Sequence, residues 1–324
     1  MNKPFRILSL SGGGIRGVFQ AVFLSKISKE LPSPLWKNFD LVCGTSTGAI
    51  VGMAVAMGID IERVVDLYKL KGESIFRKKP LSGLRKGPIY NQEPLRDELT
   101  RVLENKQLKD AKTKVLISSA SINRFDHRVF TNFPTLTRSD ENLSAVDVVL
   151  SSAAAPTYFP PVTPTGQERS YVDGGLWANT PSSLGILFAN KYLGVPLNSI
   201  RLISVGTGDF PTGATIEYFA NLRQFSLEAV KTIFELMFAS QSSFADQYSK
   251  EVLGEENYLR VSALLDEVIA LDDVAKSLSK LPPLAEAAAD IHLARIQKML
   301  LYEDKREEYI QTPDRTKLIS EHMI

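Results

Sequence analysis

The chain has 324 residues, of which 44% are hydrophobic and 23% are charged. This composition is typical of a globular protein, and the length allows one large domain or two of ordinary size. The formal net charge of +1 excludes a nucleic-acid-binding protein that relies on bulk positive charge. One cysteine, Cys43, excludes an internal disulfide. No apolar run reaches the roughly 18 residues of a membrane span, and the N-terminus lacks a signal-peptide pattern, so we expect a cytoplasmic protein.

Strands and helices alternate through the first two thirds of the chain. The apolar run 5–10 predicts a strand, and apolar residues at helical spacing predict a helix from 18 to 31. A second strand is expected to end just before residue 44, with later strands at 115–121, 127–131, 171–172 and 200–205. Further helices are expected at 47–57, 60–71, 91–104, 144–155 and 181–193. This alternation predicts an α/β protein with a mostly parallel sheet and helices on both faces.

Two parts of the chain depart from this alternation. Residues 72–90 hold glycine, proline and five basic residues, and are expected to form a loop. Strand signals nearly disappear after Gly213, so we predict an α/β domain at 1–210 and a helical C-terminal region at 211–324, packed on that domain or capping it. The helix at 226–244 is expected in the core, with a cap over the active site as the alternative.

The motif Gly44-Thr45-Ser46-Thr47-Gly48 lies between a predicted strand and a predicted helix. This is the context of a nucleophile elbow, in which a tight turn exposes a serine at the N-terminus of a helix. Gly44 and Gly48 allow the chain to pass closely around Ser46. Ser46 is therefore the predicted nucleophile, although Gly-x-Ser-x-Gly also occurs in plain turns. Cys43 lies in an apolar strand and is expected to be buried there without acting as a nucleophile.

A serine hydroxyl needs a base within hydrogen-bonding distance. The chain has three histidines: His127, His292 and His322. None of them lies in a loop typical of a catalytic residue, which disfavours a Ser-His-Asp triad. A carboxylate is the alternative. Asp173 stands at the end of a predicted strand, before Gly174 and Gly175, where α/β sheets place ligands. It is a candidate base, and an exposed Asp-Gly turn is the competing interpretation.

A glycine-rich turn follows the first strand: Gly12, Gly13 and Gly14, then Ile15 and Arg16. Backbone amides in such a turn gather around an anion, and in acyl transfer that anion is the tetrahedral oxyanion. Arg16 is expected either to add positive potential or to fix the loop. A dinucleotide fingerprint is disfavoured because no acidic partner follows on a second strand, and the lysine of a P-loop is missing.

Together, these three motifs resemble the patatin-like phospholipase family, which has them in the same order. Residues 151–161 are also similar to a family segment, and the resemblance covers roughly residues 5–210. It implies a three-layer α/β/α fold with a mostly parallel sheet and a helical C-terminal region. It further implies a Ser46–Asp173 dyad, an oxyanion loop that includes Gly12–Gly14 and Arg16, and catalysis without a cofactor or a metal.

The resemblance also implies partners. The substrate would be a membrane phospholipid, cleaved at the inner face of the membrane, and the chain is similar to bacterial anti-phage (CBASS) effectors activated by cyclic dinucleotides. Candidate phosphate contacts are Arg77, Lys78, Lys79, Arg85 and Arg223. The basic stretch 74–87 is a candidate contact for anionic headgroups, with a solvated loop as an equal alternative and binding of a phosphorylated ligand as a third one.

Three alternatives stay open from the sequence. The first alternative is a constitutive lipid acyl hydrolase of broad specificity. The second belongs to a different class: a phosphate- or nucleotide-binding module without hydrolase activity. A non-catalytic protein on a degenerate fold is disfavoured, because no member of the dyad or the oxyanion loop is missing. No nucleic-acid partner is expected, and a homo-oligomer is compatible with the sequence.

Overall fold

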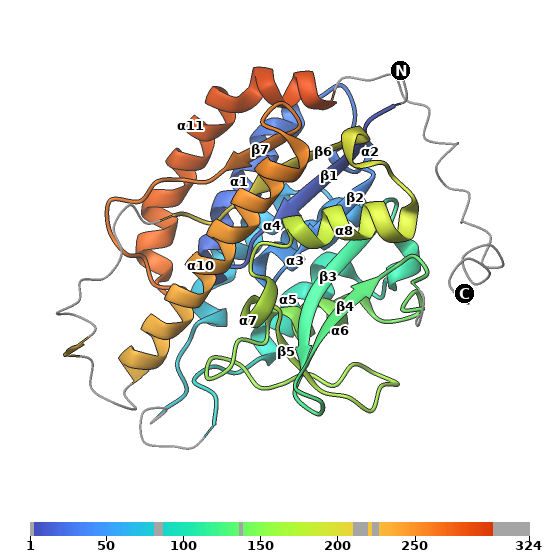
Figure 1. Cartoon of the computed structure of the whole chain (residues 1–324). Coiled ribbons are helices and arrows are strands. Elements are labelled where there is room, and N and C mark those ends of the chain that lie inside the picture. The colour runs from blue at the N-terminus through green and yellow to red at the C-terminus, as the bar shows by residue number, and fades with distance from the viewer. Residues whose placement is uncertain (1–2, 81–86, 136–138, 210–219, 222–226, 301–324) are drawn as a thin grey trace.

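The computed structural model describes residues 3–80, 87–135, 139–209, 220–221 and 227–300. A seven-stranded sheet forms the centre of the molecule, in the order β4-β3-β2-β1-β6-β7, with β5 paired to β3 (Figure 1). The strands are β1 (Phe5–Leu10), β2 (Leu41–Gly44), β3 (Lys114–Ser121), β4 (Asp126–Thr131), β5 (Tyr171–Asp173), β6 (Ile200–Val205) and β7 (Tyr258–Val261). Among the described helices, none combines the length and the apolar character that crossing a bilayer requires.

Most strand pairs are parallel, as predicted. Strands β3, β2, β1, β6 and β7 run parallel to one another, while β4 and β5 both pair with β3 in the antiparallel sense. The carboxyl ends of β1, β2 and β6 therefore meet at one edge of the sheet, and this edge is where an α/β protein builds its ligand site.

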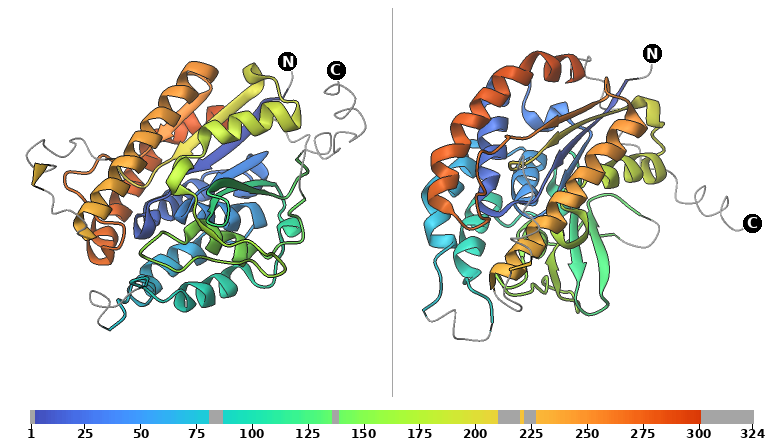
Figure 2. Two further views of the ribbon diagram at one scale, coloured as in Figure 1. Left: turned by 60° about the horizontal axis from the view of Figure 1, so that its bottom comes forward. Right: turned by 60° about the vertical axis from the view of Figure 1, so that its left-hand side comes forward.

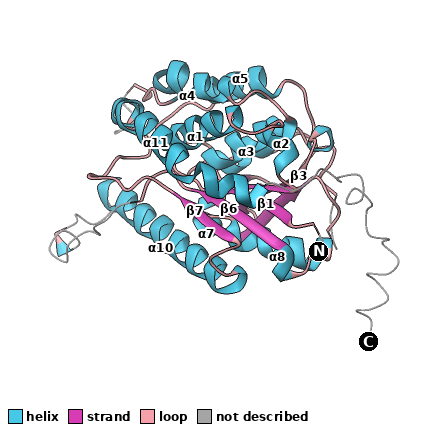
Figure 3. Cartoon of the chain, turned by 90° about the horizontal axis from the view of Figure 1, so that it is seen from above, coloured by secondary structure: helices cyan, strands magenta, loops and turns pink. Residues whose placement is uncertain are grey.

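Helices cover both faces of this sheet. They are α1 (Val18–Lys29), α2 (Leu35–Asn38), α3 (Thr47–Met57), α4 (Glu62–Ile75), α5 (Glu93–Leu103), α6 (Ala145–Ala153), α7 (Gly175–Ala178), α8 (Ser182–Leu193), α10 (Leu227–Leu253) and α11 (Val274–Leu300). Seen from above, α1, α3, α4, α5 and α11 lie on one face and α7, α8 and α10 on the other (Figure 3). The expected three-layer α/β/α arrangement is confirmed.

Neighbouring residues of the central strands point to opposite sides of the sheet and so build two hydrophobic clusters. Leu8 and Val42 belong to the larger cluster, which includes α1, α3 and α4, while Ile7, Leu41 and Cys43 belong to the cluster beneath α8. A strand that is buried on both faces is apolar at successive positions. This explains the continuous apolar runs that predicted the central strands.

The part of the chain after residue 210 contributes a strand that the sequence did not predict. β7 spans four residues, one of them Arg260, and pairs with β6 at the edge of the sheet. So short a segment with a charge inside it gives little strand signal. α11 packs against α1, and α10 lies across the opposite face (Figure 2). The division into domains at residue 210 stays a prediction.

Two expectations about individual segments need correction. The predicted loop at 72–90 begins later, because α4 continues to Ile75. The helix at 226–244 is not a core helix, since Ile233, Leu236 and Phe244 of α10 are exposed while Phe238 is buried. α10 lies on the molecular surface, so only one side of the helix packs against the protein. Its apolar residues are spread over more than one helical face, which is why the sequence predicted a core helix.

Candidate active site

Ser46 occupies a tight turn between β2 and α3, as the elbow motif predicted. Its backbone angles, φ 54° and ψ −122°, lie in a region that residues with a side chain rarely adopt. A Cβ at Gly44 would come within 2.5 Å of the Gly48 carbonyl oxygen, and one at Gly48 would overlap the Leu10 carbonyl. The turn therefore needs glycine at both positions.

The Ser46 hydroxyl donates a hydrogen bond of 2.7 Å to Asp173 Oδ2. The segment that precedes Pro156 holds both partners. The Asp173 amide donates to the Ala154 carbonyl at 3.0 Å and the Gly174 amide to the Ser152 carbonyl at 3.2 Å, while the Ser46 amide donates to Ser152 Oγ at 2.9 Å. The serine, the carboxylate and the segment similar to the family motif thus form one hydrogen-bonded unit.

Asp173 is almost completely buried, with 2% of its surface exposed. Burial raises the pKa of this carboxyl group to about 6, although the hydrogen bonds from the Ser46 hydroxyl and the Gly175 amide act in the opposite direction. A side chain at position 175 would meet the Phe238 ring at 2.9 Å, so α10 helps to enclose the carboxylate. At neutral pH the group is ionised and able to accept a proton.

The glycine-rich loop is fixed at its start by neighbouring segments. The Gly12 amide donates to the Asn179 carbonyl at 2.9 Å, and the Gly12 carbonyl accepts from Thr207 Oγ1 at 3.0 Å. Within the described residues, the Gly13 and Gly14 amides have no acceptor, and both residues line a pocket with Ser46. Gly13 and Gly14 are therefore placed to receive an anion, whereas the Gly12 amide is already occupied.

The end of this loop is fixed by the chain around residue 270. Gly14 has φ +58°, and a Cβ there would overlap the Leu271 carbonyl oxygen, which accepts the Ile15 amide at 2.9 Å. The buried Arg16 side chain donates to the Ile269 carbonyl at 3.1 Å and pairs with Glu235 at 3.4 Å. Of the two roles considered for Arg16, these contacts favour fixing the loop.

Ser46 and Asp173 line a pocket that is partly open to solvent. Most of the pocket lining is apolar and comes from α3, α4 with the residue after it, α5 and residues 153–159: Ile50, Leu67, Tyr68, Ile75, Phe76, Leu95, Ala153, Ala155, Tyr158 and Phe159. A chamber of this composition suits a hydrocarbon chain and excludes a charged ligand from its interior.

The described histidines lie elsewhere. His127 pairs with Asp126 at 2.9 Å and packs against Trp177, while His292 is on α11, where burial lowers its pKa. His322 lies outside the described residues. Cys43 is fully buried and its pKa is raised by burial, so a reactive thiolate is disfavoured there.

The basic residues named as phosphate contacts are only partly described. Arg77 and Lys78 are exposed directly after Phe76, a residue of the pocket wall, and Lys79 is half-buried. Arg85 and Arg223 lie outside the described residues. Among the His, Cys, Asp and Glu side chains that the structure describes, none form a group of three or more able to hold a metal ion.

Sequence reasoning did not find several residues that hold the site. Ser152 lies within the 151–161 segment that resembles the family, so a signal existed. Glu235, Asn179 and Leu271 carry no local signal, because each acts through a partner far away in the chain.

Residues 8–184 match the family model for patatin-like phospholipases. The chain is 29% identical over 264 residues to the cGAMP-activated phospholipase of Pseudomonas aeruginosa, covering 79% of this chain and 78% of the relative. It is 29% identical over 232 residues to the protein of the same name from Vibrio cholerae, covering 64% of this chain and 65% of that one. Patatin-like protein 4 of Arabidopsis thaliana is 26% identical over 359 residues, covering 91% and 87%. The chain therefore belongs to the patatin-like phospholipase family and is a hydrolase of lipid esters.

Proposed function

We propose that this enzyme cleaves acyl esters of membrane phospholipids with Ser46 as nucleophile and Asp173 as general base. The observation that carries the proposal is the 2.7 Å hydrogen bond between Ser46 Oγ and Asp173 Oδ2, two residues that line a largely apolar pocket. The carboxylate is buried, and burial makes it a stronger base than an exposed aspartate. The pocket supplies a place for the hydrocarbon chain of the ester.

The first half of the reaction forms an acyl-enzyme. Asp173 accepts the hydroxyl proton while Ser46 Oγ bonds to the ester carbonyl carbon, and the negative charge that develops on the carbonyl oxygen is stabilised by the Gly13 and Gly14 amides. The bond from the carbonyl carbon to the alcohol oxygen then breaks. Asp173 returns its proton to this alkoxide, and a lysophospholipid leaves.

The second half of the reaction releases the fatty acid. A water molecule attacks the acyl carbon, Asp173 accepts one of its protons, and the bond between the acyl carbon and Ser46 Oγ breaks. The proton passes to Ser46, which restores the starting dyad. No group beyond these residues and water is needed to balance the reaction.

Contact with the membrane is part of the proposal. Arg77 and Lys78 are exposed next to Phe76 at the pocket wall, which supports an approach to anionic headgroups at the inner, cytoplasmic face of a membrane. A basic residue near such a surface contributes about 1 kcal/mol. This surface would bring the pocket entrance close to the ester bonds of the bilayer.

Activation by a cyclic dinucleotide is the regulatory part of the proposal. Its support is the similarity to the Pseudomonas and Vibrio phospholipases whose names describe activation by cGAMP. Such an activator carries two phosphodiester groups, for which arginine and lysine are the fitting partners. A constitutive lipid acyl hydrolase is the alternative.

One experiment tests the reaction and its regulation together. The purified protein and Ser46→Ala are incubated with vesicles of phosphatidylethanolamine and phosphatidylglycerol, with and without a panel of cyclic dinucleotides, and the lipids are identified by mass spectrometry. We expect lysophospholipid and fatty acid from the wild type only, at a higher rate with one activator. Equal rates with and without every nucleotide favour the constitutive enzyme, and products from Ser46→Ala contradict the assignment. Light scattering on the same samples gives the oligomeric state.

A further inference from the structure

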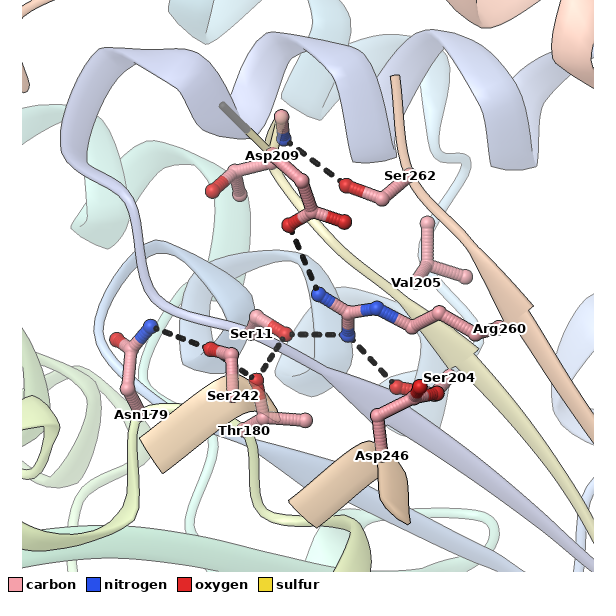
Figure 4. Close-up of polar contacts among 12 residues, drawn as sticks. Ser11, Asn179, Thr180, Ser204, Val205, Asp209, Ser242, Asp246, Arg260 and Ser262 are labelled. Atoms are coloured by element: carbon pink, nitrogen blue, oxygen red, sulfur yellow. Dashed lines mark hydrogen bonds and ion pairs between the residues drawn. The ribbon is translucent and has the colours of Figure 1, made fainter. Parts of the chain in front are cut away.

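The guanidinium group of Arg260, on β7, contacts Ser11, the residue that precedes the glycine-rich loop (Figure 4). Its Nη1 donates to Ser11 Oγ at 3.0 Å and to Ser204 Oγ at 2.9 Å, and its Nη2 pairs with Asp209 at 3.4 Å. Ser11 and Ser204 are buried, and the Arg260 side chain is 14% exposed. A charge-assisted hydrogen bond of this kind is stronger than one between neutral groups.

The surroundings are shaped around this arginine. A Cβ at Gly206 would lie 2.7 Å from Arg260 Nη2, so glycine leaves room for the guanidinium. On the other side, Ser11 Oγ is 2.8 Å from Thr180 Oγ1, which is 2.8 Å from Ser242 Oγ of α10 (Figure 4). A hydrogen-bonded series therefore runs from β7 through Ser11 to α10.

A second charged group from the same part of the chain reaches the other end of the loop. Glu235 of α10 pairs with Arg16 at 3.4 Å, and Arg16 also donates to the Ile269 carbonyl. The carboxylate is 25% exposed, while the arginine is buried. The residues on both sides of Gly12–Gly14 are thus held by side chains that lie more than two hundred positions further along the chain.

We propose that Arg260 and Glu235 are positioning residues of the oxyanion loop Gly12–Gly14. They act through Ser11 and Arg16 to set the direction of the Gly13 and Gly14 amides. Glycine has no side chain to fix its backbone angles, so these amides depend on what holds the flanks of the loop. The inference rests on the proposed function, since the loop has this task only if acyl transfer occurs at Ser46.

The geometry makes the expected effect large. An oxyanion donor acts when it lies about 2.7–3.1 Å from the developing charge, and a misplacement of about 1 Å can cost a hundredfold in rate. Losing the hydrogen bonds from Arg260 lets the start of the loop move without removing either donor. The loss then falls on stabilisation of the transition state and leaves binding of the ground-state ester intact.

The test compares Arg260→Gln, Arg260→Lys and Glu235→Gln with two matched controls. Arg295→Gln removes an arginine that holds the same strand through the Tyr258 carbonyl at 3.0 Å, and Glu251→Gln removes an exposed carboxylate from the same helix. Active sites are counted by labelling with a fluorophosphonate, and kcat and KM are measured on a soluble ester. Inhibition by a trifluoromethyl ketone, which forms a tetrahedral oxyanion, is compared with binding of a non-hydrolysable ether lipid.

We expect Arg260→Gln to lower kcat per labelled site by about tenfold or more, with KM changed by less than about twofold. Affinity for the ketone falls by the same factor as kcat/KM, and affinity for the ether lipid does not. Arg260→Lys restores part of the rate, because lysine keeps the charge but cannot donate to several partners as a fork. Glu235→Gln behaves like Arg260→Gln to a smaller extent, and both controls match the wild type.

Several results would overturn the inference. These are an unchanged kcat in folded Arg260→Gln, an equal loss in Arg295→Gln, or a loss that ketone affinity does not follow. If Arg260→Gln does not fold, Ser11→Ala removes the acceptor instead and has to show the same split between kcat and KM. A wild-type protein that is neither active nor labelled at Ser46 overturns the proposed function itself, which is a different outcome.

Discussion

Asp173 accepts hydrogen bonds on both carboxylate oxygens, from the Ser46 hydroxyl on Oδ2 and from the Gly175 amide on Oδ1, each at 2.7 Å. The amide contact fixes the orientation of the carboxylate, so that Oδ2 faces the serine. A carboxylate held in this way contacts the serine hydroxyl directly, with no histidine between them. The arrangement has consequences for pH dependence, stability and specificity.

The first prediction concerns the pH dependence of the reaction. Because the pKa of Asp173 is about 6, the active, ionised form is lost below that value, and kcat/KM should fall about tenfold per pH unit on the acid side. Rates on a soluble ester between pH 4.5 and 8 check this. A histidine would titrate in a similar range, so His127→Gln and His292→Gln are the controls. Either variant losing the acid limb would contradict the role of Asp173.

The second prediction links the same pKa to stability. The pKa of Asp173 is higher in the folded state than the ordinary aspartate value of 3.8, so the folded protein binds this proton more tightly than the unfolded chain does. The stabilisation is complete below about pH 4 and is lost as pH rises to about 6. Asp173→Asn removes this titration and should be more stable than the wild type at pH 8, by up to about 3 kcal/mol. Urea unfolding of both proteins at pH 5 and pH 8 measures the difference in their free energies of unfolding. If the stability advantage of Asp173→Asn over the wild type does not grow with pH, the prediction is refuted.

The third prediction uses the backbone angles of Ser46. Its φ of 54° is unfavourable for a residue with a side chain, and such strain costs about 1–3 kcal/mol. Ser46→Gly should therefore be inactive but more stable than Ser46→Ala, which keeps the strain. Thermal unfolding of the two variants decides this. Equal stability would mean that the turn stores no strain.

The fourth prediction concerns the length of the acyl chain. Leu95 is the residue that α5 contributes to the pocket lining, and α5 packs against α3, α4 and α6 without forming part of the elbow. Leu95→Trp should shorten the chamber and shift the preference toward shorter acyl chains, while Leu95→Ala should shift it toward longer ones. A series of esters with increasing chain length measures the shift. The same dependence of rate on acyl-chain length in the wild type and both variants would mean that the acyl chain binds elsewhere.

The sequence predicted those parts of the site whose chemistry is local. In each of the three motifs, the turn and its candidate reactive group are neighbours in the chain, so the sequence alone predicts them. The motifs are Ser46 with its two glycines, Asp173 before its glycine pair, and the loop at Gly12–Gly14. The strand and helix periods around them were readable for the same reason, since burial on both faces leaves apolar runs.

The rest of the site depends on contacts between distant segments. The Gly12 amide is occupied because it donates to the Asn179 carbonyl. The Arg16 side chain is held by its contacts with Glu235 and the Ile269 carbonyl. A single charged residue such as Arg260, which is partly buried, creates no period in the sequence. It also weakened the strand signal of β7, so the residues that support the loop were the ones that sequence patterns could not place.

Labelling of Ser46 tests the central claim most directly. The wild type, Asp173→Asn and Ser46→Ala are treated with a fluorophosphonate, digested, and analysed by peptide mass spectrometry. Because only an activated serine reacts at a useful rate, we predict one adduct, on Ser46, in the wild type, labelling slowed by about a hundredfold or more in Asp173→Asn, and none in Ser46→Ala. An adduct on another residue, or equal labelling rates in the wild type and Asp173→Asn, would contradict the Ser46–Asp173 dyad.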